Sequence, residues 1–353
     1  MQQISLEEYK IYITSEIGEQ TDFTAVLKNY SSLFVLTDEN TKKHCYPKIR
    51  SLLPPHQLIE IAAGEKEKNI ETCKKLWSQL VELNADRKSL LLNLGGGVIG
   101  DMGGFVASTF KRGFDFMQIP TTLLSQVDAS VGGKLGIDLH EMKNLIGVFK
   151  NPKAIFIATD FLKTLPQSQV QSGFAEVIKH GLIADRVYWN KVKGILLNQF
   201  FDWQEVVAKS VEIKKAVVEV DMHETGLRKI LNFGHTIGHA VETLSLQSDT
   251  RPLLHGEAIA VGMICEAFIS NQLNGLPHRE LDEIVSVLRK YFSKYDTTKI
   301  PFEKLISIIQ QDKKNVAGRF SFSLLNTIGS CEFDKHVESD VIRQSLIYYQ
   351  NLA

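Results

Sequence analysis

Side chains that could bind a metal ion or transfer protons recur at short spacings between residues 176 and 255. Glu176 and Lys179 are three residues apart, His235 and His239 are four apart, and His255 stands in the segment Leu-His-Gly-Glu. Residues three or four apart share one face of a helix. One carboxylate with two or three imidazoles suits Zn²⁺ or a similar divalent ion and leaves a position for a substrate. The spacing leaves open whether His239 is a ligand, and a histidine pair at this spacing also occurs on surfaces and in cores.

A glycine-rich turn is the second candidate site. The apolar run Leu90–Leu94 precedes Gly95-Gly96-Gly97-Val98-Ile99-Gly100-Asp101, which indicates a buried strand, a tight turn and the start of a helix. Such a helix presents backbone N–H groups to an anion, usually a pyrophosphate. Gly95, Gly97 and Gly100 satisfy the dinucleotide pattern G-x-G-x-x-G, although a plain tight turn would look similar.

The acidic residue that should accompany a dinucleotide site has two candidates. Asp115 lies near the expected distance from the glycines, but within Lys-Arg-Gly-Phe-Asp. Asp38 ends the apolar run Leu33–Thr37 and is the better partner for a ribose. The nucleotide site would then be assembled in an unusual chain order.

Several basic residues lie beside glycines, asparagines or the proposed ligands: Arg112, Lys134, Lys143, Lys179, Lys214, Arg228, Lys313 and Lys314. The net charge of −1 gives no argument for a nucleic acid or an anionic membrane as partner. Each of these residues taken singly could be a solvated surface charge. Together they favour a small substrate with several negative charges, such as phosphate and carboxylate.

The elements that position these residues change character along the chain. Strands are predicted at Leu33–Thr37, Gln57–Ile61, Ser89–Leu94, Phe116–Ile119 and Ala154–Ile157, with a helix at Ile70–Leu83. Further helices are predicted at Gly173–Ala184, Trp203–Val220, Ile230–Thr243, Gly256–Asn271, Arg279–Phe292 and Phe302–Asp312, with one strand at Arg319–Leu325. Strand–helix alternation indicates a parallel sheet covered by helices. We therefore predict a Rossmann-like α/β domain over residues 1–160, a mainly α-helical domain over residues 161–353, and an active site in the cleft between them.

Composition limits the class of protein. A hydrophobic share of 44% and a charged share of 23% are those of an ordinary soluble protein. The four cysteines are scattered, which indicates reduced thiols in the cytoplasm. The acidic N-terminus lacks a signal-peptide core, and no apolar run is long enough to span a bilayer.

With these motifs assembled, the chain resembles the 3-dehydroquinate synthases over nearly its whole length. The segments that carry the resemblance are Gly95–Asp101, Pro120–Leu124, Asp128–Lys134, Lys143–Gly147, Phe161–Pro166, Gly173–Lys179, Gly226–Arg228, Leu231–His239 and Leu254–Gly256. The resemblance implies two domains, a homodimer, bound NAD and one Zn²⁺ or Co²⁺. It also implies metal ligands at Glu176, His235 and His255, which places His239 on the substrate side or behind the ligands.

The resemblance implies roles for further residues, matched position by position. NAD would be held by Asp38, Asn40, Glu65, Lys68, Gly97, Val98, Ile99, Gly100, Asp101, Thr121, Thr122, Lys134, Lys143, Phe161, Leu162, Lys163 and Thr164. Catalytic residues would be Asp128, Lys134, Lys179, Asn232 and His239. Substrate would be bound by Asn144, Lys214, Arg228 and one of Lys313 and Lys314, with Arg112 reaching across the dimer.

The implied reaction converts 3-deoxy-D-arabino-heptulosonate 7-phosphate to 3-dehydroquinate and phosphate, in the shikimate pathway. NAD oxidises a hydroxyl transiently, phosphate is eliminated, the ketone is reduced again, and an aldol step closes the ring. One alternative is a related sugar-phosphate cyclase, such as a 2-epi-5-epi-valiolone or 2-deoxy-scyllo-inosose synthase, whose substrate has no carboxylate. Another is a metal-dependent polyol dehydrogenase, and a third is a non-catalytic nucleotide-binding module.

Overall fold

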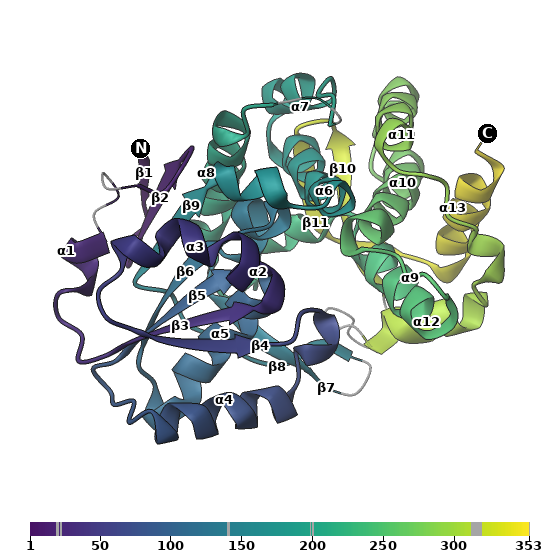
Figure 1. Ribbon diagram of the computed structural model, residues 1–353. Helices are drawn as coiled ribbons and strands as arrows, with labels where there is room; N and C mark the ends of the chain where they lie inside the picture. Colours follow the sequence, from purple (N-terminus) through teal and green to yellow (C-terminus); the bar gives the residue numbers. More distant parts are fainter. Residues whose placement is uncertain are drawn as a thin grey trace. The chain divides into compact units, whose positions relative to one another are not determined.

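The computed structural model describes residues 1–18, 21, 23–139, 142–197, 199, 201–311 and 320–352. The chain forms two compact units (Figure 1), Met1–Val170 with Phe200–Lys215, and Gln171–Gln199 with Ala216–Ala353. Residues 200–215 therefore belong to the first unit although they lie beyond the predicted boundary at residue 160. Contacts such as the ion pair between Lys214 and Asp128 attach this segment to the first unit.

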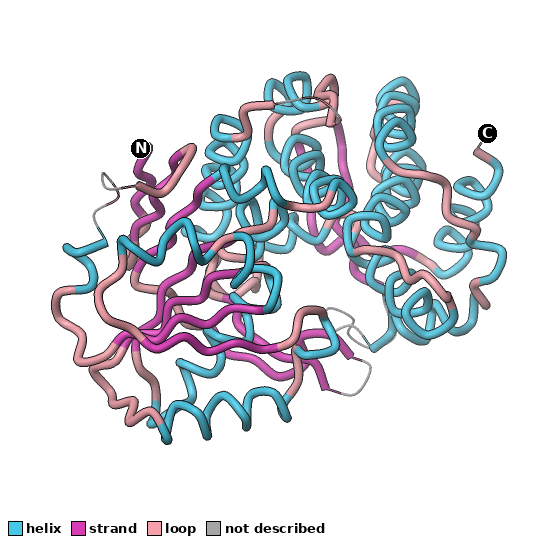
Figure 2. The backbone as a smooth tube through the Cα atoms, in the orientation of Figure 1, coloured by secondary structure: helices cyan, strands magenta, loops and turns pink. Residues whose placement is uncertain are grey.

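A seven-stranded sheet forms the middle of the first unit, in the order β1-β2-β9-β6-β5-β3-β4. The strands are β1 (Gln2–Ser5), β2 (Lys10–Thr14), β3 (Leu33–Asp38), β4 (Gln57–Ile61), β5 (Leu90–Gly95), β6 (Asp115–Pro120) and β9 (Ala154–Ala158). β1 pairs with β2 in antiparallel fashion, and the other pairs are parallel. Figure 2 shows these strands side by side. The carboxyl ends of the parallel strands therefore meet at one edge, where such folds bind ligands.

Helices cover both faces of this sheet. They are α1 (Phe23–Leu27), α2 (Glu39–His44), α3 (Tyr46–Ile49), α4 (Ile70–Glu82) and α5 (Gly97–Thr109). Alternate residues of β3 enter different apolar clusters, because successive side chains of a strand point to opposite faces. Phe34 packs with residues of α4 and α5, whereas Val35 lies in a cluster with residues of α1 and α3 and with Cys45 between α2 and α3. Two buried faces explain why these strands are recognisable as continuous apolar runs.

An antiparallel hairpin of β7 (Lys134–Leu139) and β8 (Met142–Phe149) also belongs to the first unit. No strand was predicted here, because β8 is exposed or half-buried along its whole length and glycine interrupts the apolar residues of both strands, Gly136 in β7 and Gly147 in β8. The hairpin packs on α5, where a Cβ on Gly104 would lie 2.4 Å from Leu135 Cδ2.

The second unit is mainly helical. Its helices are α6 (Gln167–Ala184), α7 (Arg186–Val192), α9 (His235–Ser248), α10 (His255–Leu273), α11 (His278–Tyr291), α12 (Phe302–Gln311) and α13 (Ser339–Asn351). α8 (Gln204–Val220) begins in the first unit and ends in the second, and β10 (Phe320–Thr327) pairs with β11 (Ser330–Val337). The predicted fold class, a parallel-sheet α/β domain with a mainly helical one, is confirmed.

One predicted helix is wrong at its start. The sequence predicted a continuous helix from Ile230, but α9 begins at His235 after a 3-10 turn over Leu227–Asn232. Gly234 separates the two with a φ of 80°, a left-handed conformation that glycine adopts without a steric penalty. The break places His235 at the first position of a helix instead of its middle.

Helices α9 and α10 approach each other at glycines. A Cβ on Gly262 of α10 would lie 1.9 Å from the Gly234 carbonyl oxygen and 2.7 Å from the Gly238 amide nitrogen. Backbone atoms cannot give way as a flexible side chain can. Close helix packing therefore depends on the missing side chain at this position.

Gly262→Ala should destabilise the protein by about 1–3 kcal/mol or more, the usual cost of overpacking. Chemical denaturation measures this change in the free energy of unfolding. Gly194→Ala is the matched control, because nothing lies within 4 Å of a Cβ there. Equal stability of the two variants would contradict the packing argument.

A search of the described residues finds no helix with the length and apolarity needed to cross a bilayer.

Candidate active site

In the first unit, the glycine turn joins the carboxyl end of β5 to the N-terminus of α5. Gly96 is the N-cap of α5, and no side-chain hydrogen bond caps the helix. The first backbone N–H groups of the helix are thus left to be satisfied by water or an anion. Space around the turn is limited, since a Cβ on Gly96 would lie 3.0 Å from Thr122 Cγ2. These features fit a backbone cradle for a phosphate group.

The structure separates the two candidate acids. Asp38 lies at the carboxyl end of β3, the strand next to β5, where its side chain accepts a hydrogen bond from Thr41 N at 2.7 Å. Asp115 opens β6 opposite Leu90 and accepts from Tyr30 Oη at 3.1 Å. Asp115 therefore lies at the amino end of the sheet, away from the glycine turn. The preference for Asp38 agrees with this placement.

Other residues predicted to bind NAD follow the carboxyl ends of neighbouring strands. Asn40 follows β3, Glu65 and Lys68 follow β4, Thr121 and Thr122 follow β6, and Phe161, Leu162, Lys163 and Thr164 follow β9. Parallel pairing brings these segments to the edge that carries Gly97, Val98, Ile99, Gly100 and Asp101.

Not all of these side chains are available to a ligand. Ile99, Phe161 and Leu162 are 1%, 2% and 6% exposed, and the first two belong to the apolar clusters. They can offer only backbone groups. The Lys163 ammonium lies 2.6 Å from Asp160 Oδ1 at the surface, so its charge already has a partner.

A buried lysine ties the hairpin to this edge. Lys68 Nζ donates to Asp101 Oδ2 and to Asn144 Oδ1, both at 2.6 Å. Burial lowers the pKa of Lys68, but Asp101 and Glu65 more than offset this and raise it, so the ammonium stays charged. Lys143 Nζ lies 3.7 Å from Glu65 Oε1. Five predicted ligand residues thus form one connected polar group.

Asp128 and Lys214 form a second polar group in the first unit. Lys214 Nζ lies 2.8 Å from Asp128 Oδ1 and also donates to the Asp128 carbonyl oxygen at 2.5 Å. Lys214 is only 5% exposed. Lys134 is exposed at the start of β7, after Gly132 and Gly133 with φ values of 98° and 65°.

In the second unit, α6, α9 and α10 bring the predicted metal ligands together. Glu176 Oε1 lies 3.4 Å from His235 Nε2 and 3.5 Å from His255 Nε2. Lys179 forms an ion pair with the other oxygen. Within the described residues, neither Glu176 oxygen makes a hydrogen bond of ordinary geometry. A cation would stabilise such a buried acceptor pair.

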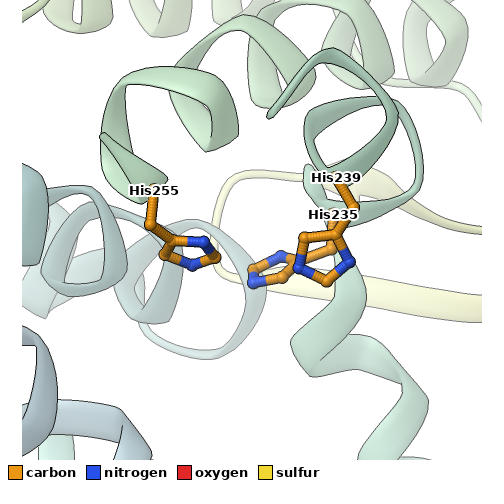
Figure 3. A group of neighbouring side chains, drawn as sticks. All are labelled: His235, His239 and His255. Atoms are coloured by element: carbon orange, nitrogen blue, oxygen red, sulfur yellow. The ribbon is translucent and has the colours of Figure 1, made fainter. Parts of the chain in front are cut away.

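These separations match a metal site. Ligand atoms about 2.0–2.2 Å from a tetrahedral Zn²⁺ lie about 3.3–3.6 Å from one another. Both distances from Glu176 Oε1 fall within this range. His239 lies close as well, since one nitrogen of each histidine lies within 4.8 Å of the others. Figure 3 shows the rings of His235 and His239 from α9 gathered with that of His255 from α10.

The Nδ1 atoms of the two imidazoles face acceptors. His235 Nδ1 lies 3.1 Å from the Phe233 carbonyl oxygen, and His255 Nδ1 lies 3.3 Å from Glu242 Oε2. With a hydrogen on each Nδ1, the lone pair of each Nε2 faces Glu176. Metal-binding histidines usually have this arrangement.

The charges of this group are strongly coupled. Burial raises the pKa of Glu176, but Lys179 and His235 lower it well below its usual value. Burial, aided by Lys179, lowers the pKa of His235. Burial also lowers the pKa of His255, but Glu242 and Glu176 reverse this and raise it to about 9. Glu176 is therefore ionised and His235 neutral, whereas a divalent ion would have to displace a proton from His255 in order to bind its Nε2.

Three residues that position the ligands were missed from the sequence. Gly256 N donates to Ser172 Oγ at 2.9 Å, which docks the first turn of α10 on α6. Glu266, fully buried, accepts from Gly234 N at 2.6 Å and Ile237 N at 3.0 Å, so it holds the turn before His235. Glu242 could have been found from its spacing of seven from His235, and Glu266 as an acid inside the apolar part of α10. Ser172 gives no signal.

Two further predicted substrate residues lie before α9. Arg228 is 2% exposed and donates from Nη1 to the Met222 carbonyl oxygen at 2.6 Å. Asn232 Nδ2 donates to Glu224 Oε1 at 2.6 Å. Glu224 has a φ of 60°, so the loop that presents these groups is held in an uncommon backbone conformation.

Arg112 stands apart from these groups. Arg112 follows the C-terminal end of α5, a helix of 13 residues, and so lies about 20 Å from the glycine turn at its N-terminus. Arg112 cannot reach that turn within the same chain. Lys313 and Lys314 lie outside the described residues.

Comparisons with known proteins cover most of the chain. Residues 58–172 match the family profile described as 3-dehydroquinate synthase N-terminal, and residues 173–315 match the 3-dehydroquinate synthase C-terminal profile. A 3-dehydroquinate synthase from Parabacteroides distasonis is 40% identical over 351 residues, which cover 98% of this chain and 99% of that protein.

Solved structures share the fold at lower identity. A 2-deoxy-scyllo-inosose synthase complexed with carbaglucose-6-phosphate, NAD⁺ and Co²⁺ has a TM-score of 0.83 at 23% identity, covering 100% and 99% of the two chains. A 2-epi-5-epi-valiolone synthase from Streptomyces hygroscopicus subsp. jinggangensis with NAD⁺ and Zn²⁺ bound has a TM-score of 0.83 at 22% identity, covering 99% and 98%.

At such low identities, likeness establishes the fold and not the reaction. Family membership rests on the two profile matches and on the 40% identity along nearly the full chain. These findings confirm the resemblance derived from the motifs: the chain belongs to the 3-dehydroquinate synthase family.

Proposed function

We propose that this chain converts 3-deoxy-D-arabino-heptulosonate 7-phosphate to 3-dehydroquinate and phosphate, as a cytoplasmic homodimer that uses NAD and Zn²⁺ or Co²⁺. The observation that carries the proposal is the 40% identity with a curated 3-dehydroquinate synthase over 98% of this chain. The two cyclases of other specificity are only 23% and 22% identical to this chain in sequence.

Glu176, His235 and His255 are the metal ligands in this proposal. Their support is the pair of separations, 3.4 and 3.5 Å, from one carboxylate oxygen to two imidazole nitrogens. Three protein ligands leave a coordination position for the substrate. His239 then lies beside the ligands on the substrate side, where a ring nitrogen can take up a proton.

The carboxyl edge of the sheet is the proposed NAD site. Backbone N–H groups at the start of α5 would hold the pyrophosphate of NAD, and Asp38 would hold the ribose. Lys68 and Asp101 would contact polar groups of NAD next to these. Bound NAD would take up and return a hydride, while the divalent ion would acidify the hydroxyl that is oxidised. The hydrogen bonds of Lys68 to Asp101 and Asn144 fix this edge before a ligand arrives.

Buried cations support an anionic substrate. Lys179, Arg228 and Lys214 are 1%, 2% and 5% exposed, and a charge acts more strongly away from water. We assign Arg228 to the carboxylate, because a guanidinium can bind it through two hydrogen bonds. We assign Lys134 to the phosphate, with Lys179, Lys214, Asn144, Asn232 and Asp128 as further contacts of the substrate. A neutral polyol would need no such set, which favours the synthase over a polyol dehydrogenase.

Removal of one ligand should remove the metal. His255→Ala should lose stoichiometric Zn²⁺ or Co²⁺ and activity with it, because two remaining ligands bind weakly. Elemental analysis of the purified protein measures the loss. His278→Ala is the matched control: His278 also begins a helix, but its side chain is 74% exposed. A full equivalent of metal in His255→Ala would refute the ligand assignment.

NAD should act catalytically, because the hydride removed from the substrate returns to it. We expect many phosphate ions released per NAD, with no accumulation of free NADH absorbance. Substrate labelled with deuterium at the oxidised carbon should give product with deuterium at the same carbon, as measured by mass spectrometry. Stoichiometric accumulation of NADH would instead indicate a dehydrogenase.

The position of Arg112 leads to a test of the homodimer. If Arg112 serves the partner's phosphate site, mixing inactive Arg112→Ala with inactive Lys134→Ala should restore roughly a quarter of wild-type activity. With random pairing, half of the dimers contain one subunit of each variant, and one of the two sites in each of these dimers is intact. Mixing Lys134→Ala with Lys214→Ala should restore none, since both act in one subunit's site. Failure to recover activity after verified subunit exchange would disprove a shared site.

A further inference from the structure

Glu242 is a buried acid that the proposed ligand and substrate sets do not include. Its side chain is 3% exposed, and its Oε2 lies 3.3 Å from Nδ1 of His255. Glu242 belongs to α9, whereas His255 is the first residue of α10. The contact therefore joins a carboxylate on one helix to a proposed metal ligand on the next.

The position of Glu242 on α9 places it with the other site residues. His235, His239 and Glu242 occupy positions i, i+4 and i+7 of the helix, which share one face. Figure 3 shows His235 and His239 directed towards His255. One face of α9 thus supplies a proposed ligand and a carboxylate in contact with a proposed ligand from α10.

The two proposed imidazole ligands are held differently. His235 Nδ1 faces the neutral carbonyl group of Phe233 at 3.1 Å, whereas His255 Nδ1 faces the carboxylate of Glu242. An Nδ1–H group that donates to a carboxylate leaves the lone pair on Nε2 and makes the ring a stronger electron donor. His255 Nε2 lies 3.5 Å from Glu176 Oε1, so the lone pair faces the proposed metal position.

We propose that Glu242 is a positioning residue, which holds His255 in the tautomer and orientation that bind the divalent ion and thereby raises metal affinity. This inference rests on the proposed metal site. It differs from a purely structural role, in which Glu242 would only join α9 to α10. A structural role predicts lower stability with unchanged affinity of the folded protein for metal.

Glu242→Gln tests the proposal with little change in side-chain volume. The affinity for Zn²⁺ is measured on metal-depleted full-length protein by competition with a chromogenic chelator, and Co²⁺ is used for its visible absorption spectrum. Loss of an orienting partner of a metal ligand costs about 10–100-fold in metal affinity. We expect a loss of this size in Glu242→Gln, together with an altered Co²⁺ spectrum. Glu242→Asp, which keeps the charge, should recover part of the affinity.

Glu280→Gln is the matched control for loss of a partly buried carboxylate in the same unit. Glu280 is 15% exposed on its side chain, pairs with Arg186 and accepts from Ile328 N at 2.6 Å. The Glu280→Gln variant should lose stability and keep the metal affinity of the wild type. An equal loss of affinity in Glu280→Gln would overturn the inference, since the effect would then be unspecific.

The outcomes separate this inference from the proposed function. Wild-type protein that binds no stoichiometric metal would overturn the metal site and the inference with it. Wild-type protein that binds metal, with Glu242→Gln equal to it in affinity and Co²⁺ spectrum, would overturn only the role of Glu242. If Glu242→Gln fails to fold, Glu242→Asp is compared with the wild type: a partial loss of metal affinity with an altered Co²⁺ spectrum supports the role of Glu242, and wild-type values overturn it.

Discussion

The fully buried carboxylate of Glu176 is the constraint on which the second unit depends. An ionised group without solvent is costly unless positive or hydrogen-bonding groups surround it. Lys179 comes from the same helix, but the two imidazoles must be brought from α9 and α10. Three helices therefore have to meet within a few ångströms of one carboxylate.

The close approach of these three helices explains several residues that are not themselves proposed to bind a ligand. A Cβ on Gly256 would lie 2.0 Å from the Ser172 carbonyl oxygen, and one on Gly262 would overlap the Gly234 carbonyl oxygen. Glu266 satisfies the backbone N–H groups at the start of α9 that the turn at Gly234 leaves open. Small side chains and one buried acid thus set the distances between the functional groups.

In the first unit, the ligand edge depends on the backbone more than on particular side chains. Its ligand edge is made by strand direction, since parallel pairing aligns the carboxyl ends of β3, β4, β5, β6 and β9. The same fold occurs in cyclases that share only 22% or 23% of residues with this chain. A shared fold therefore does not decide which substrate is accepted, which depends on the side chains placed at the site.

The sequence by itself determined the features that depend on local pattern. The buried strands were recognisable as apolar runs, the glycine turn by its composition, and Glu176, His235, His239 and His255 by their spacing as candidate ligands. The hairpin of β7 and β8 was not predicted, because Gly136 and Gly147 interrupt the apolar residues of its two strands. Nor could it place the break at Gly234, since a left-handed residue inside a helical pattern leaves the periodicity intact. Only the tertiary structure placed Asp38 and Asp115 at opposite ends of the sheet, and only it joined Glu242 to His255 and Ser172 to Gly256. These contacts link separate elements, and their distances follow from how helices and strands pack and not from spacing along the chain.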